Sequence, residues 1–150
     1  MQRIRNRVVL IAMIMTIALS MLLCACGDVK VQVRLVKNDE KLVMIEALAT
    51  GGSLEDALNE LKTKGELDYV GSQSEYGCYL ISINGYVPDA AEHEFWAIYT
   101  SLTEYDGVTY SNEEFGTYDY AGETYVSAAY GISGMPLVSG YVYILAVTTY

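Results

Sequence analysis

Residues 51–65 read GGSLEDALNELKTKG, and they predict a helix whose two ends are both marked by suitable residues. Ser53 suits the N-cap, and Asp56, three residues further on, completes a capping box. Gly65 suits the position that follows the last helical turn. Apolar side chains recur at helical spacing along one face, which comprises Leu54, Ala57, Leu58 and Leu61. The stretch therefore predicts a helix that buries one face in the core.

Strands are predicted on both sides of this helix. Before it, residues 29–36 alternate apolar and polar side chains, and they pair with residues 41–50 as a hairpin across the polar turn at 37–40. After it, the predicted strands are 67–70, 78–83, 95–99, 108–110, 124–130 and 141–149. The predicted loops are 71–74, 111–122 and 131–140.

This order of elements predicts an α+β fold. An N-terminal hairpin, one helix and then additional strands are typical of a β-grasp-like domain, in which the helix packs across one face of a mostly antiparallel sheet. We expect the apolar last strand to return beside the first, because that position would bury it.

The first 27 residues have the pattern of a bacterial lipoprotein signal. Three arginines precede an apolar run over residues 8–23, which as a helix covers about 24 Å, less than the ~30 Å of a bilayer core. The run ends in Leu-Cys-Ala-Cys at residues 23–26. We expect cleavage after Ala25 and attachment of lipid, with palmitate among its acyl chains, to the Cys26 thiol. An ordinary cleaved signal peptide is the alternative.

Acidic residues dominate the mature chain, residues 26–150, whose length suits a single domain. Loss of the predicted signal peptide, residues 1–25, takes away three of the nine basic residues and none of the 19 acidic ones, which leaves a formal net charge of −13. No Lys or Arg occurs from Gly65 to Tyr150, a stretch that holds twelve carboxylates and all 14 tyrosines. Nucleic-acid binding is excluded, because it depends on Lys and Arg contacts to phosphate. The acidic surface either attracts cations or a basic partner, or it maintains solubility.

Tyrosines in the predicted loops are candidate ligand-binding residues. Tyrosine offers a large contact area at low entropic cost, although its β propensity equally allows it to cover strand surfaces. The candidates, which we expect to gather at one end of the domain, are Tyr86, Tyr105, Tyr110, Tyr118 and Tyr120. Trp96 is either part of an aromatic platform for a ligand or, as its size favours, part of the core.

No catalytic residue, cofactor or metal ligand is expected. Cys78 and His93 are the candidates for a nucleophile and a base, but a reactive thiol needs nearby positive charge, which this half of the sequence lacks. We expect Cys78 to be buried and inert, and a hydrolase that uses it is the least favoured alternative.

Zinc needs three or four N or S ligands, so the Glu-His-Glu run at 92–94 is expected to be solvated. Calcium stays open, without the spacing of a calcium loop, at Asp106, Glu113, Glu114 and Asp119.

Three segments resemble a domain of a known family. They are GGSLEDAL at 51–58, YGCYLISING at 76–85 and FWAIY at 95–99. Together they are similar to the C-terminal (β) domain of transcobalamin and intrinsic factor, a domain common in lipoproteins and surface proteins of Gram-positive bacteria. The resemblance covers about residues 29–150. Residues 100–107 depart from it, because a longer segment replaces the short Asn-Gly or Asp-Gly turn that is usual there.

The resemblance implies a binding domain. In the vitamin carriers this domain covers cobalamin against a helical domain that has no counterpart in residues 26–150, so no cobalamin-contacting residue carries over. We expect a lipid-anchored, non-catalytic binding or interaction domain on the outer face of the bacterial cytoplasmic membrane. The alternatives are capture of a small ligand, such as a corrinoid, for an uptake system, and a structural envelope protein.

Overall fold

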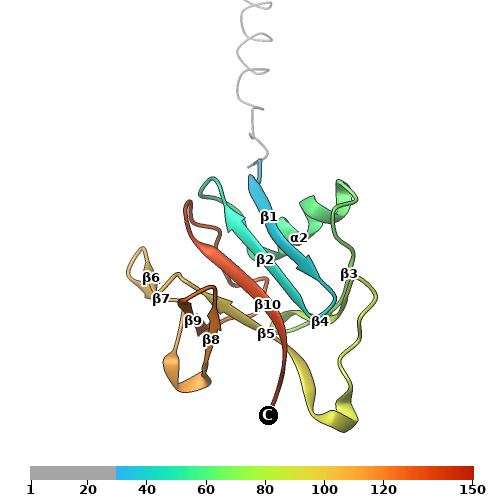
Figure 1. The fold of residues 1–150 in the computed structure, drawn as a ribbon. Coiled ribbons are helices and arrows are strands. Elements are labelled where there is room, and N and C mark those ends of the chain that lie inside the picture. Colours follow the sequence, from blue (N-terminus) through green and yellow to red (C-terminus); the bar gives the residue numbers. More distant parts are fainter. Residues whose placement is uncertain (1–29) are drawn as a thin grey trace, which may run out of the picture. The chain divides into compact units, whose positions relative to one another are not determined.

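The computed structural model describes residues 30–150, of which residues 31–150 form one compact unit (Figure 1). The predicted signal peptide and Cys26 lie outside the described residues. Two strands, β1 (Val33–Asp39) and β2 (Leu42–Ala47), precede the helix α2 (Leu54–Thr63). The elements that follow are β3 (Tyr69–Ser74), β4 (Gly77–Ile83), β5 (Glu94–Thr100), β6 (Glu104–Tyr105), β7 (Val108–Thr109), β8 (Thr117–Tyr120), β9 (Glu123–Ser127) and β10 (Val142–Thr149). Short 3-10 turns lie at Ala90–Glu92 and Glu113–Phe115.

Six of these strands form one antiparallel sheet in the order β1-β2-β10-β5-β9-β8. The β3–β4 and β6–β7 hairpins form two separate two-stranded sheets. Within the described residues one α-helix packs on this mostly antiparallel architecture, so the predicted α+β class is confirmed. None of the described helices has the length and apolarity that crossing a bilayer requires.

The last strand does not lie beside the first, and that expectation is wrong. β10 lies between β2 and β5, in the middle of the sheet. The reason is that β10 is apolar on both faces, because four consecutive side chains, Tyr143 to Ala146, are buried. A central position covers both faces, whereas a neighbour of β1 would stand at the edge of the sheet.

Helix α2 has the ends and the buried face that the sequence predicts. The Ser53 side chain accepts a hydrogen bond from the Asp56 N–H, and the Asp56 side chain accepts one from the Ser53 N–H. The predicted apolar stripe is fully buried. It packs with β2 residues Val43 and Ile45 and β10 residues Tyr143 and Leu145, and Figure 1 shows α2 behind β1 and β2.

A second apolar cluster covers the other face of the sheet. Its buried members are Met44, Ala97, Tyr99, Tyr125, Ile144 and Ala146. On β5, Trp96 joins the cluster on the helix side while Ala97 and Tyr99 join the second one, as the alternation of a strand requires. Trp96 is 8% exposed, so its assignment to the core is confirmed.

The first strand begins and ends later than predicted, at Val33–Asp39 in place of residues 29–36, and it contains a bulge. Its register with β2 shifts between Leu35 and Lys37, which leaves Val36 as the extra residue. Beyond the bulge, residues 37–39 pair with β2, although the sequence predicts a turn there. Polar residues are tolerated at these positions, since β1 stands at the edge of the sheet.

Two segments predicted as loops are strands. Gly71–Ser74 belongs to β3 and pairs with β4, and part of the predicted loop at 111–122 forms β8, which pairs with β9. Both strands are short, rich in polar residues and exposed on at least one face, so their local sequence carries little strand signal. Pairing with a neighbouring strand supplies what local propensity does not.

Replacing Leu58 by Ala should lower the free energy of unfolding by about 2–5 kcal/mol, because truncation of a buried leucine leaves a cavity. Leu58 is fully buried, whereas the Lys64 side chain at the end of the same helix is 44% exposed. Urea denaturation of Leu58→Ala measures the effect, and Lys64→Ala is the control. A loss below about 1 kcal/mol for Leu58→Ala would contradict the assignment of this face to the core.

Candidate functional site

The structure does not bring the five candidate tyrosines together. Tyr86 lies beside the start of β5, Tyr105 and Tyr110 follow the other end of β5, and Tyr118 and Tyr120 belong to β8. Tyr105 is 39% exposed, and the other four are half-buried. The five therefore do not form one recognition surface, and a binding role for each of them stays a prediction.

Tyr86 donates a hydrogen bond to an ion pair between Lys41 and Glu94, and this contact connects the segment between β4 and β5 to the sheet. Its hydroxyl donates a hydrogen bond to Glu94 Oε2 at 2.5 Å, and Lys41 Nζ donates to Glu94 Oε1 at 2.7 Å. Lys41 Nζ also lies 4.8 Å from the centre of the Tyr86 ring. The bonds from Lys41 and then Tyr86 lower the pKa of Glu94 to about 2, and Glu94 and Tyr86 raise the pKa of Lys41. These contacts join the β1–β2 turn, β5 and the segment between β4 and β5.

Tyr118 and Tyr120 cover the second apolar cluster. The Tyr118 ring lies 5.3 Å from the ring of Tyr99, and both β8 tyrosines pack against buried residues of that cluster. Lys37 Nζ lies 5.5 Å from the centre of the Tyr120 ring. Because β1 and β8 are the two outer strands of the sheet, this contact means that the sheet curls over its own face.

Tyr110 joins the β6–β7 hairpin to the segment after β9. Its ring lies 5.4 Å from the Tyr130 ring, its N–H donates to the Thr103 carbonyl, and its carbonyl accepts from the Ala129 N–H. Tyr105, within the hairpin itself, is the most exposed of the five candidates.

Cys78 and His93 lie in different surroundings and do not form a nucleophile and base pair. Cys78 is buried, as predicted, and its N–H donates to Ser133 Oγ at 2.8 Å. Burial, followed by the nearby Glu55 carboxylate, raises the pKa of the Cys78 thiol, which disfavours the thiolate. The His93 ring instead lies 5.0 Å from the ring of Tyr150, the last residue of the sequence.

No metal site emerges in the described part of the chain. Across residues 30–150, no three His, Cys, Asp or Glu side chains are grouped so that they could hold a metal ion together. The acidic residues considered for calcium are thus not gathered into a common ligand set.

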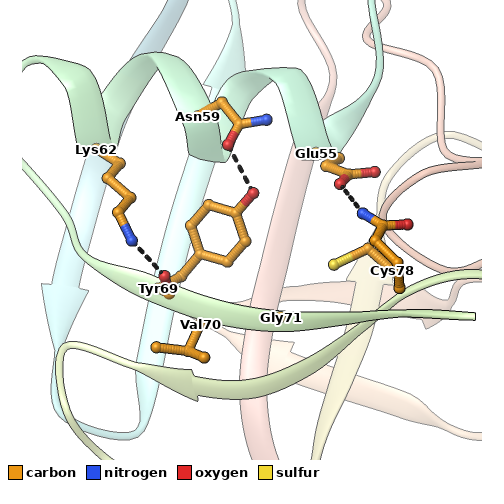
Figure 2. A pocket seen from close by; sticks show the side chains of 8 residues that line it. Glu55, Asn59, Lys62, Tyr69, Val70, Gly71 and Cys78 are labelled. Carbon is orange, nitrogen blue, oxygen red and sulfur yellow. Dashed lines mark hydrogen bonds between the residues drawn. The ribbon is translucent and has the colours of Figure 1, made fainter.

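A pocket of about 300 Å³ lies between α2 and β3 (Figure 2). Its lining residues are Glu55, Asn59 and Lys62 from α2, Tyr69, Val70, Gly71 and Gln73 from β3, and Cys78 from β4. Figure 2 shows the three α2 side chains pointing from the helix toward β3. This pocket is the candidate binding site, because it is concave and combines an aromatic ring with several polar groups.

Hydrogen bonds cross the pocket at three points. Lys62 Nζ donates to the Tyr69 carbonyl at 2.7 Å, and the Tyr69 hydroxyl donates to Asn59 Oδ1 at 2.7 Å. At the other end, Gln73 Nε2 donates to Glu55 Oε1 at 2.8 Å. Lys62 also forms an ion pair with Asp68, whereas Ser133 donates a hydrogen bond to the second Glu55 oxygen. The pocket is therefore charge-balanced at the Lys62 end and acidic at the Glu55 end.

The floor of the pocket requires glycine. A Cβ atom placed on Gly71 would lie 2.3 Å from Cys78 Sγ, far inside van der Waals contact. A side chain at position 71 would therefore have to displace the Cys78 thiol, and glycine leaves the main chain of β3 uncovered at this position. These groups can recognise a polar ligand by hydrogen bonds, and burial raises the pKa of the Cys78 thiol beneath them.

Sequence reasoning missed this pocket, although two signals for it exist. Glu55, Asn59 and Lys62 recur at helical spacing beside the apolar stripe, but a solvated helix face has the same pattern. The run Tyr69–Ser74 has no charged residue and no proline, which is compatible with an edge strand as well as with a loop. What the sequence does not reveal is that these two segments lie side by side.

Comparison with known proteins finds no family model and no curated protein that matches this chain.

Replacing Glu94 by Gln should remove part of the pH dependence of the free energy of unfolding. The pKa of Glu94 falls from its ordinary 4.5 to about 2 in the folded state. Its charged form therefore contributes stability that is fully present above pH 4.5 and is lost as the pH falls through 2. Thermal melts of wild type and Glu94→Gln across this window measure the effect, with Glu92→Gln as the exposed neighbouring control. Identical pH profiles for wild type and Glu94→Gln would contradict the role of this ion pair.

Proposed function

We propose that residues 26–150 form a lipid-anchored, non-catalytic binding domain on the outer face of the bacterial cytoplasmic membrane, with lipid on the Cys26 thiol. The order of basic residues, apolar run and Leu-Cys-Ala-Cys supports the anchor. The partner that follows from the anchor is the membrane. Nucleic acid is not proposed as a partner, because the chain is acidic and nucleic-acid binding depends on Lys and Arg.

The observation that carries the binding function is the pocket between α2 and β3. It holds a carboxylate, an ammonium group, two amides and a phenol around a bare strand. Burial and the nearby Glu55 carboxylate raise the pKa of the thiol, which supports binding rather than nucleophilic catalysis. We assign no cofactor to the domain.

We further propose that the fold is β-grasp-like and related to the C-terminal domain of transcobalamin and intrinsic factor. The order of hairpin, helix and further strands, and the Trp strand at the middle of the sheet, support this relation. Capture of a small ligand is the second candidate, and the volume of about 300 Å³ favours a ligand smaller than a corrinoid. A structural envelope protein is the third, and it would leave the pocket without a ligand.

Replacing Cys26 by Ala should abolish membrane association and lipid labelling, because the lipid is attached to this thiol. Cys24→Ala is the matched control and should keep both, since Leu23 is too large for the position that precedes a lipidated cysteine. Radiolabelled fatty acid and membrane fractionation of cells that express each variant provide the two readouts. Labelling that survives in Cys26→Ala and disappears in Cys24→Ala would place the lipid on Cys24 and contradict the assignment to Cys26.

Binding at the pocket is tested with the full-length lipidated protein in detergent micelles. We expect at least one class among amino acids, monosaccharides, nucleosides and short peptides, each at about 10 mM so that millimolar binding is detected, to slow hydrogen exchange in α2 and β3. Protection should not extend to β8 and β9, whose tyrosines belong to the second cluster and which contribute no residue to the pocket. Absence of protection in α2 and β3 with every class would contradict the binding function and favour a structural role.

A further inference from the structure

Strand β3 has an open edge that faces the pocket. β3 pairs with β4 and with no other strand in the described part of the chain. Four of its residues line the pocket together with α2, and the Tyr69 carbonyl accepts its hydrogen bond from Lys62 on the helix. Figure 2 shows β3 running beneath the α2 side chains. On the side opposite β4, the main chain of β3 therefore has no strand partner among the described residues.

This edge lacks the charge and the proline that often protect an exposed strand, although its register with β4 shifts between Val70 and Gly71. The sequence of β3 is YVGSQS, which contains no charge and no proline. Its residues after Tyr69 are all exposed, and Val70 is 47% exposed. Natural edge strands commonly carry lysine, proline or a covering element to prevent pairing with another chain. Here Lys62 occupies one carbonyl at the Tyr69 end, and residues 71–74 remain open.

The length and the charge of the pocket define what can pair with this edge. From Glu55 to Lys62 the helix rises by roughly 10 Å, which matches about three to four residues of extended chain. Lys62 is already paired with Asp68, whereas the ring of groups around Glu55 contains no cation. From Gly65 to Tyr150 the chain has no Lys or Arg that could supply one. A cationic group on the ligand complements the Glu55 end.

We propose that the pocket binds a short extended peptide segment, which adds as a strand to the open edge of β3 and places a primary ammonium group at Glu55. This inference rests on the proposed binding function of the same pocket and names its ligand class. Strand addition suits the site, because main-chain hydrogen bonds supply affinity without a deep pocket. The ammonium belongs either to the peptide N-terminus or to a lysine side chain.

A second copy of the chain fits this edge less well. Each mature chain carries a formal net charge of −13, so two copies repel each other. A peptide with an ammonium group meets the opposite charge at the same place.

The test uses the full-length lipidated protein in detergent and tetra-alanine with a fluorophore at its C-terminus. We expect fluorescence anisotropy to show binding, and hydrogen exchange to slow in residues 70–74. N-acetylation should weaken binding about fivefold, as loss of a partly exposed ion pair does.

N-acetyl-Lys-Ala-Ala-Ala distinguishes the two sources of the ammonium group, the peptide N-terminus and a lysine side chain. It binds like the free peptide only if a lysine side chain supplies the ammonium. N-methylation of alternate peptide nitrogens should weaken binding at least about tenfold, since it removes the main-chain donors.

A matched pair of variants tests the place of the charge. Glu55→Gln should remove the advantage of the free amino group, whereas Glu60→Gln on the same helix, where Glu60 pairs with Lys64, should keep it. Equal binding of the N-methylated peptide, equal loss in both variants, or protection outside β3 would overturn the proposal. Concentration-dependent protection of β3 without peptide, together with dimers in sedimentation, would assign the edge to a second copy instead. Protection of the pocket by another ligand class alone would overturn this inference and leave the binding function intact.

Discussion

Burial of one face of α2 against β2 and β10 is the interaction on which the rest of the structure depends. Leu54, Leu58 and Leu61 are fully buried, and this fixes the rotation of the helix about its axis. The polar residues beside them, Glu55 and Asn59, are fixed by the same contact, because side chains on a helix keep constant angular offsets. The core and the pocket therefore share one constraint, and a change that rotates the helix would move the pocket wall away from β3.

Tyrosine serves mainly as a structural residue in this domain. Tyr143 is fully buried, and its hydroxyl donates to the Pro136 carbonyl and accepts from the Val138 N–H. Burial raises its pKa to about 12. A phenol fills core volume while it also bonds main-chain groups of a loop. Tyr86 packs against Trp96 and donates to Glu94, and Tyr118 packs against Tyr99. A high tyrosine content in predicted loops is thus compatible with a core function, and by itself it does not locate a binding surface.

The sequence predicted the elements whose signals are local and missed the features that depend on distant partners. The helix was predictable because its cap, its stripe and its final glycine lie within fifteen residues. The bulge at Val36 and the strand at Gly71–Ser74 depend on pairing with β2 and β4, which local propensity does not encode. The pocket depends on the contact between α2 and β3, and the sequence pattern of neither segment predicts that the two pack together. Tertiary contact therefore created the candidate site from residues that look like ordinary surface.

Most polar groups that line the pocket already have partners, and this limits how tightly it binds. Asn59, Lys62 and Gln73 each make a hydrogen bond with another lining residue. A ligand that engages them exchanges one bond for another, and a hydrogen bond formed by exchange contributes only about 0.5–1.5 kcal/mol. Net gain must come from the open edge of β3 and from the acidic end at Glu55, so the proposed site favours an extended backbone over a particular side chain. On the proposed membrane tether, neighbouring envelope peptides are held at high effective concentration, and a site of modest affinity is then occupied without further contacts.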